Sequence, residues 1–168
     1  MKKYIAFIHF ILTIILFESC GIYSFTGASI APEIKTISIK YFQNRSSLIQ
    51  PSLSQAFTEK LKDKFISQTN LRLINESADL KLEGYISDYR TQPVAIQGTQ
   101  TAALNRLTIS ISVKFVNTKD DKQNYETVFS RYADYNAQKS LSEIEQSLIE
   151  DINKQLVDDI FNKSVSNW

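Results

Sequence analysis

Residues 106–115 read Arg-Leu-Thr-Ile-Ser-Ile-Ser-Val-Lys-Phe, and apolar and polar residues alternate along them without exception. Successive side chains of a β-strand point to opposite faces of its sheet. Leu107 and every second residue up to Phe115 are therefore expected to face a core, and the residues between them to face solvent. This stretch predicts a half-buried β-strand.

Three further stretches predict strands. Apolar residues occupy the odd positions of 36–41 and the even positions of 80–87. Residues 125–135 follow a charged turn, 117–124, and are expected to pair antiparallel with the strand before it. Their alternation is blurred because Phe129 and Tyr135 share a face with Arg131, which favours an edge strand or a bulge. A short apolar piece around Leu71 and a long polar connection, 91–101, complete this part of the chain.

Two stretches have helical periodicity. Pro51 and Ser52 begin the first helix, whose apolar residues recur every fourth position from Leu53 to Phe65. The second helix follows Ser140, and its apolar stripe runs from Ile144 to Ile160. Ser52 and Ser140 each have Gln or Glu three residues later, the spacing of a capping box. The order β-α-β-β-β-α predicts an α+β fold, a two-layer sandwich in which two helices cover one face of a four-stranded, mostly antiparallel sheet.

The other face of the predicted sheet is polar. It is expected to carry the following residues: Thr36, Ser38, Lys40, Lys81, Glu83, Tyr85, Arg106, Thr108, Ser110, Ser112 and Lys114. One solvated face is ordinary for an antiparallel sheet, although such a surface would also suit the water-lined inside of a barrel. The final helix is acidic, with six acids against one lysine between Leu141 and Phe161. That helix face either is solvated or contacts a basic partner.

The first twenty residues have the pattern of a secretory signal. Lys2 and Lys3 precede an apolar run, which is followed by the only cysteine, Cys20. The run is shorter than the roughly 20 residues that a membrane-spanning helix needs. A lone cysteine at this point resembles the acylation site of a bacterial lipoprotein, although Phe17 and Glu18 depart from the usual lipobox. We expect a signal peptide at 1–19, a lipidated tether at 20–33 and one domain at 34–168.

Composition argues against an enzyme. Without residues 1–19 the chain carries 17 basic and 17 acidic side chains, so it lacks the basic excess expected of a nucleic-acid-binding protein. The one histidine lies in the signal and the one cysteine is the expected lipidation site, so the usual general base and zinc ligands are missing. No phosphate-binding glycine loop or nucleophile elbow is present. We expect no catalysis, no metal and no cofactor besides the lipid on Cys20.

Several segments, taken in order, resemble the LptE family of lipopolysaccharide-assembly lipoproteins, in its Bacteroidota-type branch. The resemblance covers nearly the whole mature chain and no single segment is a catalytic signature. The segments are 20–25 (Cys-Gly-Ile-Tyr-Ser-Phe), 37–45 (Ile-Ser-Ile-Lys-Tyr-Phe-Gln-Asn-Arg), 53–59 (Leu-Ser-Gln-Ala-Phe-Thr-Glu), 105–109 (Asn-Arg-Leu-Thr-Ile), 129–134 (Phe-Ser-Arg-Tyr-Ala-Asp) and 157–162 (Val-Asp-Asp-Ile-Phe-Asn).

The resemblance implies a lipoprotein anchored in the outer membrane that faces the periplasm. Members of the family plug a large β-barrel partner, help to assemble it, and in some cases bind lipopolysaccharide. Cations near the lipid phosphates would be needed for that binding. The candidates on the predicted strands are Lys40, Lys81, Arg106, Lys114 and Arg131.

Two other interpretations remain open. Residues 41–46 and 78–84 also resemble lipoproteins of curli secretion and activators of peptidoglycan synthases. That resemblance implies a periplasmic lipoprotein that activates a different envelope machine. A hydrolase is the third interpretation, and the missing histidine and cysteine argue against it.

Overall fold

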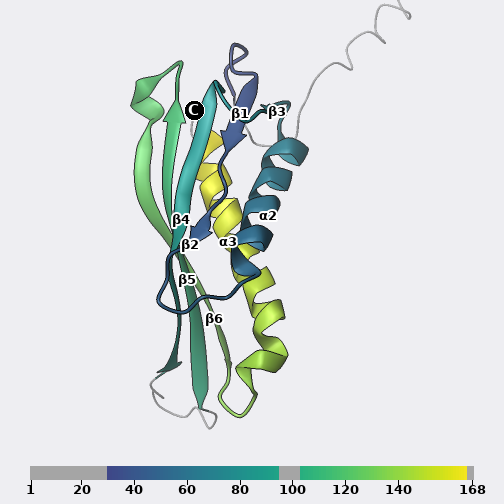
Figure 1. The fold of residues 1–168 in the computed structure, drawn as a ribbon, viewed down its shortest axis with the longest axis vertical. Helices are drawn as coiled ribbons and strands as arrows, with labels where there is room; N and C mark the ends of the chain where they lie inside the picture. Colours follow the sequence, from purple (N-terminus) through teal and green to yellow (C-terminus); the bar gives the residue numbers. More distant parts are fainter. Residues whose placement is uncertain (1–29, 95–102, 166–168) are drawn as a thin grey trace, which may run out of the picture.

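Two helices pack on one face of a mixed β-sheet (Figure 1). The computed structural model describes residues 30–94 and 103–165, so Cys20 and the predicted signal peptide lie outside the described residues. The elements, in chain order, are β1 (Thr36–Ile39), β2 (Gln43–Asn44), α2 (Leu53–Gln68), β3 (Arg72–Leu73), β4 (Leu80–Val94), β5 (Leu104–Asn117), the 3-10 helix η1 (Asp121–Gln123), β6 (Tyr125–Asn136) and α3 (Leu141–Val165). The predicted α+β class and the two helices are confirmed.

Over the described residues, the sheet has six strands rather than the predicted four. Its order is β3-β1-β4-β5-β6, and β2 also pairs with β4. β4, β5 and β6 pair antiparallel in chain order. β1 pairs in parallel with β3 and with β4, and β2 pairs in parallel with β4. The prediction was wrong on the count because β2 and β3 have two residues each, too few to create a period. The hairpin of β5 and β6 is confirmed, with no register shift.

The predicted polar connection is wrong at its beginning, because β4 continues through Pro93 to Val94. Within the described part of the chain, β4 pairs with β5 alone beyond Ile86, so its other side is a sheet edge. Proline, which cannot donate a backbone hydrogen bond, is tolerated at such an edge. The pairing of β4 with β5 also shifts register between Ile86 and Asp88, and after this bulge Tyr89 is the buried residue of β4.

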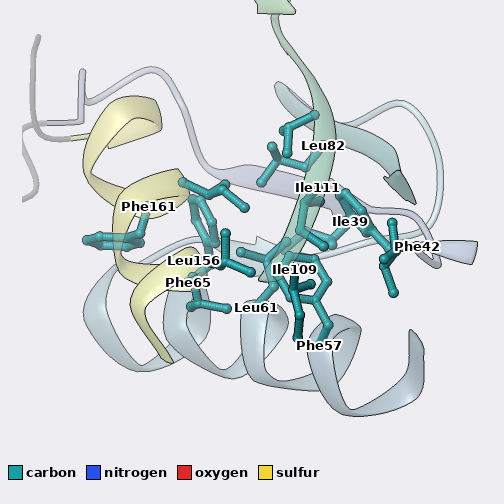
Figure 2. Packing of buried hydrophobic residues seen from close by; sticks show 14 of the residues in the cluster. Ile39, Phe42, Phe57, Leu61, Phe65, Leu82, Ile109, Ile111, Leu156 and Phe161 are labelled. Atoms are coloured by element: carbon teal, nitrogen blue, oxygen red, sulfur yellow. The ribbon is translucent and has the colours of Figure 1, made fainter. Parts of the chain in front are cut away.

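The core lies between the sheet and the helices (Figure 2). The residues that the alternation placed inward on β5, from Leu107 to Phe115, are all buried. The α2 stripe meets them, and its four predicted members, Leu53, Phe57, Leu61 and Phe65, are fully buried. An edge-to-face aromatic pair joins Phe42, beside the sheet, to Phe57 of α2 at 5.2 Å between ring centroids, and a second joins Phe65 of α2 to Phe161 of α3 at 5.1 Å. Burial of this many apolar side chains drives the sandwich to form.

The capping box predicted at Ser52 is wrong. Ser52 is the N-cap of α2, but its side chain makes no capping hydrogen bond. Its hydroxyl instead donates to Oε1 of Gln50 at 2.9 Å, and its backbone N–H donates to the same oxygen at 2.7 Å. The preceding loop therefore competes for the hydroxyl that a capping box would use.

One carboxylate fastens the first strand to the start of β4. Oδ2 of Asp79 accepts hydrogen bonds from the backbone N–H groups of Lys35 and Thr36, both at 3.0 Å, and from the Thr36 hydroxyl at 2.8 Å. The backbone N–H of Asp79 donates back to that hydroxyl at 3.0 Å. These hydrogen bonds favour the ionised carboxylate, and the N–H of Lys35 contributes most to holding the pKa of Asp79 below its ordinary value of 3.8.

We expect Asp79→Asn to destabilise the protein at neutral pH by about 2 kcal/mol, because a charge-assisted acceptor is lost. A carboxylate with a lowered pKa stabilises the fold above its unfolded pKa, and this stabilisation is lost as the pH falls through the folded pKa. Urea unfolding of both proteins should therefore give a constant difference above about pH 5 that shrinks in more acidic buffer. A difference that is the same at every pH would contradict this role.

Candidate interaction surface on the open sheet face

The side of the sheet away from the helices is the candidate functional surface, and we call it the open face. It comprises the polar positions of β1, β4, β5 and β6 together with Lys40. The predicted outward residues of β5 lie on it, since their neighbours from Leu107 to Phe115 face the core. Three of its small residues, Ser38, Thr108 and Ser110, are nevertheless buried by the longer side chains around them. Two of their hydroxyl groups are hydrogen-bonded within the molecule, since Ser38 donates to the backbone oxygen of Asn75 and Ser110 to the hydroxyl of Ser130, both at 2.9 Å.

A row of alternating charges crosses the open face from β1 to β6. The ammonium of Lys40 lies 2.7 Å from the Glu83 carboxylate. In the sheet register Glu83 is opposite Lys114, which is in turn opposite Glu126. Opposite charges at facing positions stabilise strand pairing. These four side chains, with Arg45, Tyr85 and their neighbours, line a shallow depression of ≈ 380 Å³.

Lys81 lies beside a second depression on the open face. This depression has a volume of ≈ 270 Å³ and is also lined by Ser38, Lys40 and the turn 75–77. Among residues 30–94 and 103–165, no carboxylate forms an ion pair with Lys81 or Lys114. These two ammonium groups are thus the predicted cations that remain available to an external anion.

Arg106 is held by a neighbouring strand. Its guanidinium donates two hydrogen bonds to Asp134, at 2.7 and 2.9 Å, and lies 3.6 Å from the centre of the Tyr132 ring. The guanidinium keeps the pKa of Asp134 below its ordinary value. A bidentate pair that also stacks on an aromatic ring uses most of the donors of an arginine. Arg106 thus organises this end of the open face.

Arg131 does not join the other predicted cations. It pairs in register with the buried Ile109 and so faces the helix layer, where it donates two hydrogen bonds to Asp159 of α3, at 2.6 and 2.7 Å. The five candidates are therefore divided. Lys40, Lys81 and Lys114 gather around the two depressions, Arg106 lies farther along the sheet, and Arg131 lies on the opposite side.

Most acidic side chains of α3 bind partners within the molecule. Glu150 and Asp158 pair with lysines of α2, at 3.9 and 2.7 Å, and Asp159 binds Arg131. The hydroxyl of Tyr89 donates to Glu145 at 2.5 Å, and burial raises the pKa of that tyrosine. Four of the six acids thus connect α3 to its neighbours. The acidic face of α3 is therefore neither fully solvated nor fully available to a basic partner.

Sequence reasoning missed two members of this surface. Arg45 was not among the predicted residues of this surface, yet its guanidinium lies 4.6 Å from the centre of the Tyr85 ring. Glu126 was not placed on a face because the alternation of its strand is blurred. A register for β6, counted inward from the charged turn, would have put Glu126 opposite Lys114.

No helix in the described part of the chain is long and apolar enough to cross a membrane.

The chain matches one protein family and is similar in fold to several solved structures. The family model described as LptE, lipopolysaccharide-assembly, matches residues 34–164. No curated protein matches the chain significantly. This fold is similar to that of a hypothetical protein from Chlamydia trachomatis, with a TM-score of 0.53 and 10% identity over 80% of this chain and 99% of that one.

Two further solved structures are similar. A putative neuraminyllactose-binding hemagglutinin homolog from Helicobacter pylori has a TM-score of 0.54 and 8% identity, over 81% of this chain and 85% of that chain. A minor lipoprotein from Acinetobacter baumannii has a TM-score of 0.48 and 14% identity, over 78% and 95%. At these identities the likeness concerns the fold alone.

Proposed function

Because the chain belongs to the LptE family of lipopolysaccharide-assembly proteins, we propose that it plugs and helps to assemble the outer-membrane β-barrel that delivers lipopolysaccharide to the cell surface. The family match over residues 34–164 is the observation that carries this proposal. In it the protein is non-catalytic, faces the periplasm and is anchored by a lipid on Cys20.

The character of the open face supports insertion into a barrel. The interiors of large outer-membrane barrels are polar, and the widest are plugged by protein. A surface of hydroxyl groups and paired charges can meet such a wall through hydrogen bonds and bridging water. The apolar residues of β4 and β5 face the helices instead, so the fold does not need a partner to cover its core.

Lipopolysaccharide is the proposed second ligand. Its phosphates would bind at Lys81 and Lys114, which have no carboxylate partner among the described residues, and Lys40, paired with Glu83, lies beside both depressions. Arg106 and Arg131 are weaker candidates, since each already has a bidentate carboxylate.

Purification of the acylated protein from detergent-solubilised outer membranes tests the function. We expect mass spectrometry to find a large barrel protein at about one copy per chain.

Lys114→Glu places a third carboxylate between Glu83 and Glu126, and it should reduce the recovered barrel severalfold while the thermal melting curve remains cooperative. Lys122→Glu, in η1, is the matched control and should recover the wild-type amount. Recovery of a peptidoglycan synthase or a secretion pore in place of the barrel would transfer the function to the activator interpretation.

Cys20→Ala tests the anchor. Acyl chains on a cysteine bind a membrane through about 0.8 kcal/mol per buried methylene group, and two or more chains give stable attachment. We expect the variant to move from the membrane fraction to the periplasmic fraction, with the circular dichroism of the wild type. Tight association with membranes after this substitution would mean that lipidation is not the main anchor.

A further inference from the structure

The sheet ends in a long strand that has a partner on one side only. Among the described residues, β6 pairs with β5 and with no other strand. Its twelve residues span about 40 Å at 3.3 Å per residue. On the opposite side the edge is formed by β3, with only two residues, and by the part of β4 beyond Ile86, which contains Pro93. An edge strand presents a row of unpaired backbone N–H and C=O groups, which is a template for another strand.

Proteins usually protect such an edge with proline, lysine, a bulge or an inward-pointing charge. β6 contains no proline and no lysine, and its pairing with β5 has no register shift. Its one inward charge, Arg131, is bound by Asp159 and so is directed to α3. Of these protections only the inward-pointing Arg131 is present, its charge is neutralised by Asp159, and the rest of the edge is rich in strand-favouring Tyr, Thr, Val and Phe residues.

Exposed apolar residues gather on the same strand. Val128 is 59% exposed and Tyr132 is 52% exposed, and both lie on the open face of β6 with Ser130 between them. The charged residues of β6 on that face are Glu126 and Asp134, near its two ends. The strand thus offers an apolar and hydroxyl centre between Glu126 and Asp134, the second of which is already paired with Arg106.

We infer that β6 binds an extended segment of another protein, which adds to the sheet as a further strand. The segment carries apolar residues beside Val128 and Tyr132, and basic or uncharged residues beside Glu126 and Asp134. Backbone hydrogen bonds along β6 supply the affinity, and these alternating side chains supply the specificity. This inference concerns the sheet edge and does not depend on the partner being a barrel.

The same charges disfavour a second copy of this chain as the occupant. Two antiparallel copies of β6 aligned at Ser130 would place Glu126 of each copy opposite Asp134 of the other. Like charges directly opposite each other destabilise strand pairing. A heterologous segment avoids this repulsion at both ends.

Photo-crosslinking along the strand tests the inference. A photoreactive amino acid replaces Val128, Ser130 and Tyr132 in turn in the full acylated chain in cells, and mass spectrometry maps the partner residue that is captured. In an added strand the partner residue must move by about two positions for each two-residue step along β6, within one continuous segment. Leu73, on the opposite edge, is the control position and should not capture that segment.

A lysine at the edge gives an independent measurement. Val128→Lys should lower crosslinking from position 132 about tenfold, an effect of about 1.4 kcal/mol. Leu73→Lys should leave it unchanged, and both variants should melt like the wild type. Scattered crosslinks, crosslinks to β6 of a second copy, or no dependence on Val128→Lys would overturn the inference.

The outcome is distinguishable from that of the proposed function. Recovery of the barrel without a regular crosslink pattern would overturn strand addition alone. A regular pattern in a protein other than the barrel would support strand addition and contradict the proposed partner.

Discussion

Ile111→Asp is expected to unfold the domain. Ile111 is fully buried, and in the sheet register it lies between Ile86 of β4 and Phe129 of β6. A carboxylate there either stays ionised without a partner or binds a proton at a large cost in free energy. We expect a loss on the order of 4 kcal/mol or more, comparable with the whole stability of a small domain. Circular dichroism and urea unfolding at neutral pH would measure it.

Ser112→Asp is the matched control for this substitution. Ser112 is the next residue of the same strand, and it lies on the open face, where it borders the depression with Lys40 and Lys114. The new carboxylate would be hydrated there and close to cations, so we expect a change within about 1 kcal/mol. A folded Ile111→Asp protein, or equal losses from both substitutions, would contradict the facing of β5.

The long alternating stretches made most of the fold predictable. Residues 106–115 and 80–87 face as their periods indicate, because a half-buried strand must place every second residue in the core. The two-residue strands could not be predicted in this way, since they are defined by their backbone pairing with β1 and β4. The continuation of β4 beyond Ser87 was missed for a related reason. The bulge there changes the phase of the alternation, and Pro93 is a strand breaker anywhere except at an edge.

The candidate surface was predictable as a face but not as a set of interactions. The sequence placed Lys40, Lys81, Arg106 and Lys114 on one side of the sheet, and the structure agrees for these residues. Which of them is already paired depends on the register between strands, which brings Asp134 to Arg106 across twenty-eight positions of sequence. Arg131 lies on the other face, as its shared periodicity with Phe129 indicates, and its partner comes from a distant helix.

Gly84→Ala is expected to be the most damaging small substitution. A Cβ atom at residue 84 would lie 2.1 Å from the backbone oxygen of Ser112 and 2.5 Å from Cε1 of Phe42. Both distances are far inside van der Waals contact, and the first involves a backbone atom of the neighbouring strand, which side-chain rotation cannot move. Phe42 itself is fully buried against Phe57. Overpacking of this kind costs about 1–3 kcal/mol where the core can adjust, and we expect the upper end or beyond because part of the clash is with backbone.

Urea unfolding of Gly84→Ala beside Glu83→Ala separates this clash from a general effect of alanine in β4. Glu83 lies on the open face, and its exposed ion pair with Lys40 is worth at most about 1 kcal/mol. Phe42→Leu divides the clash in two, because a smaller side chain relieves the contact with Phe42 and leaves the one with Ser112. In the Gly84→Ala background Phe42→Leu should therefore cost less than it does in the wild type, while the double variant stays less stable than Phe42→Leu alone. Additive losses would mean that Phe42 does not occupy the space beside Gly84, and a neutral Gly84→Ala would mean that β4 and β5 are not as close at this point as the register requires.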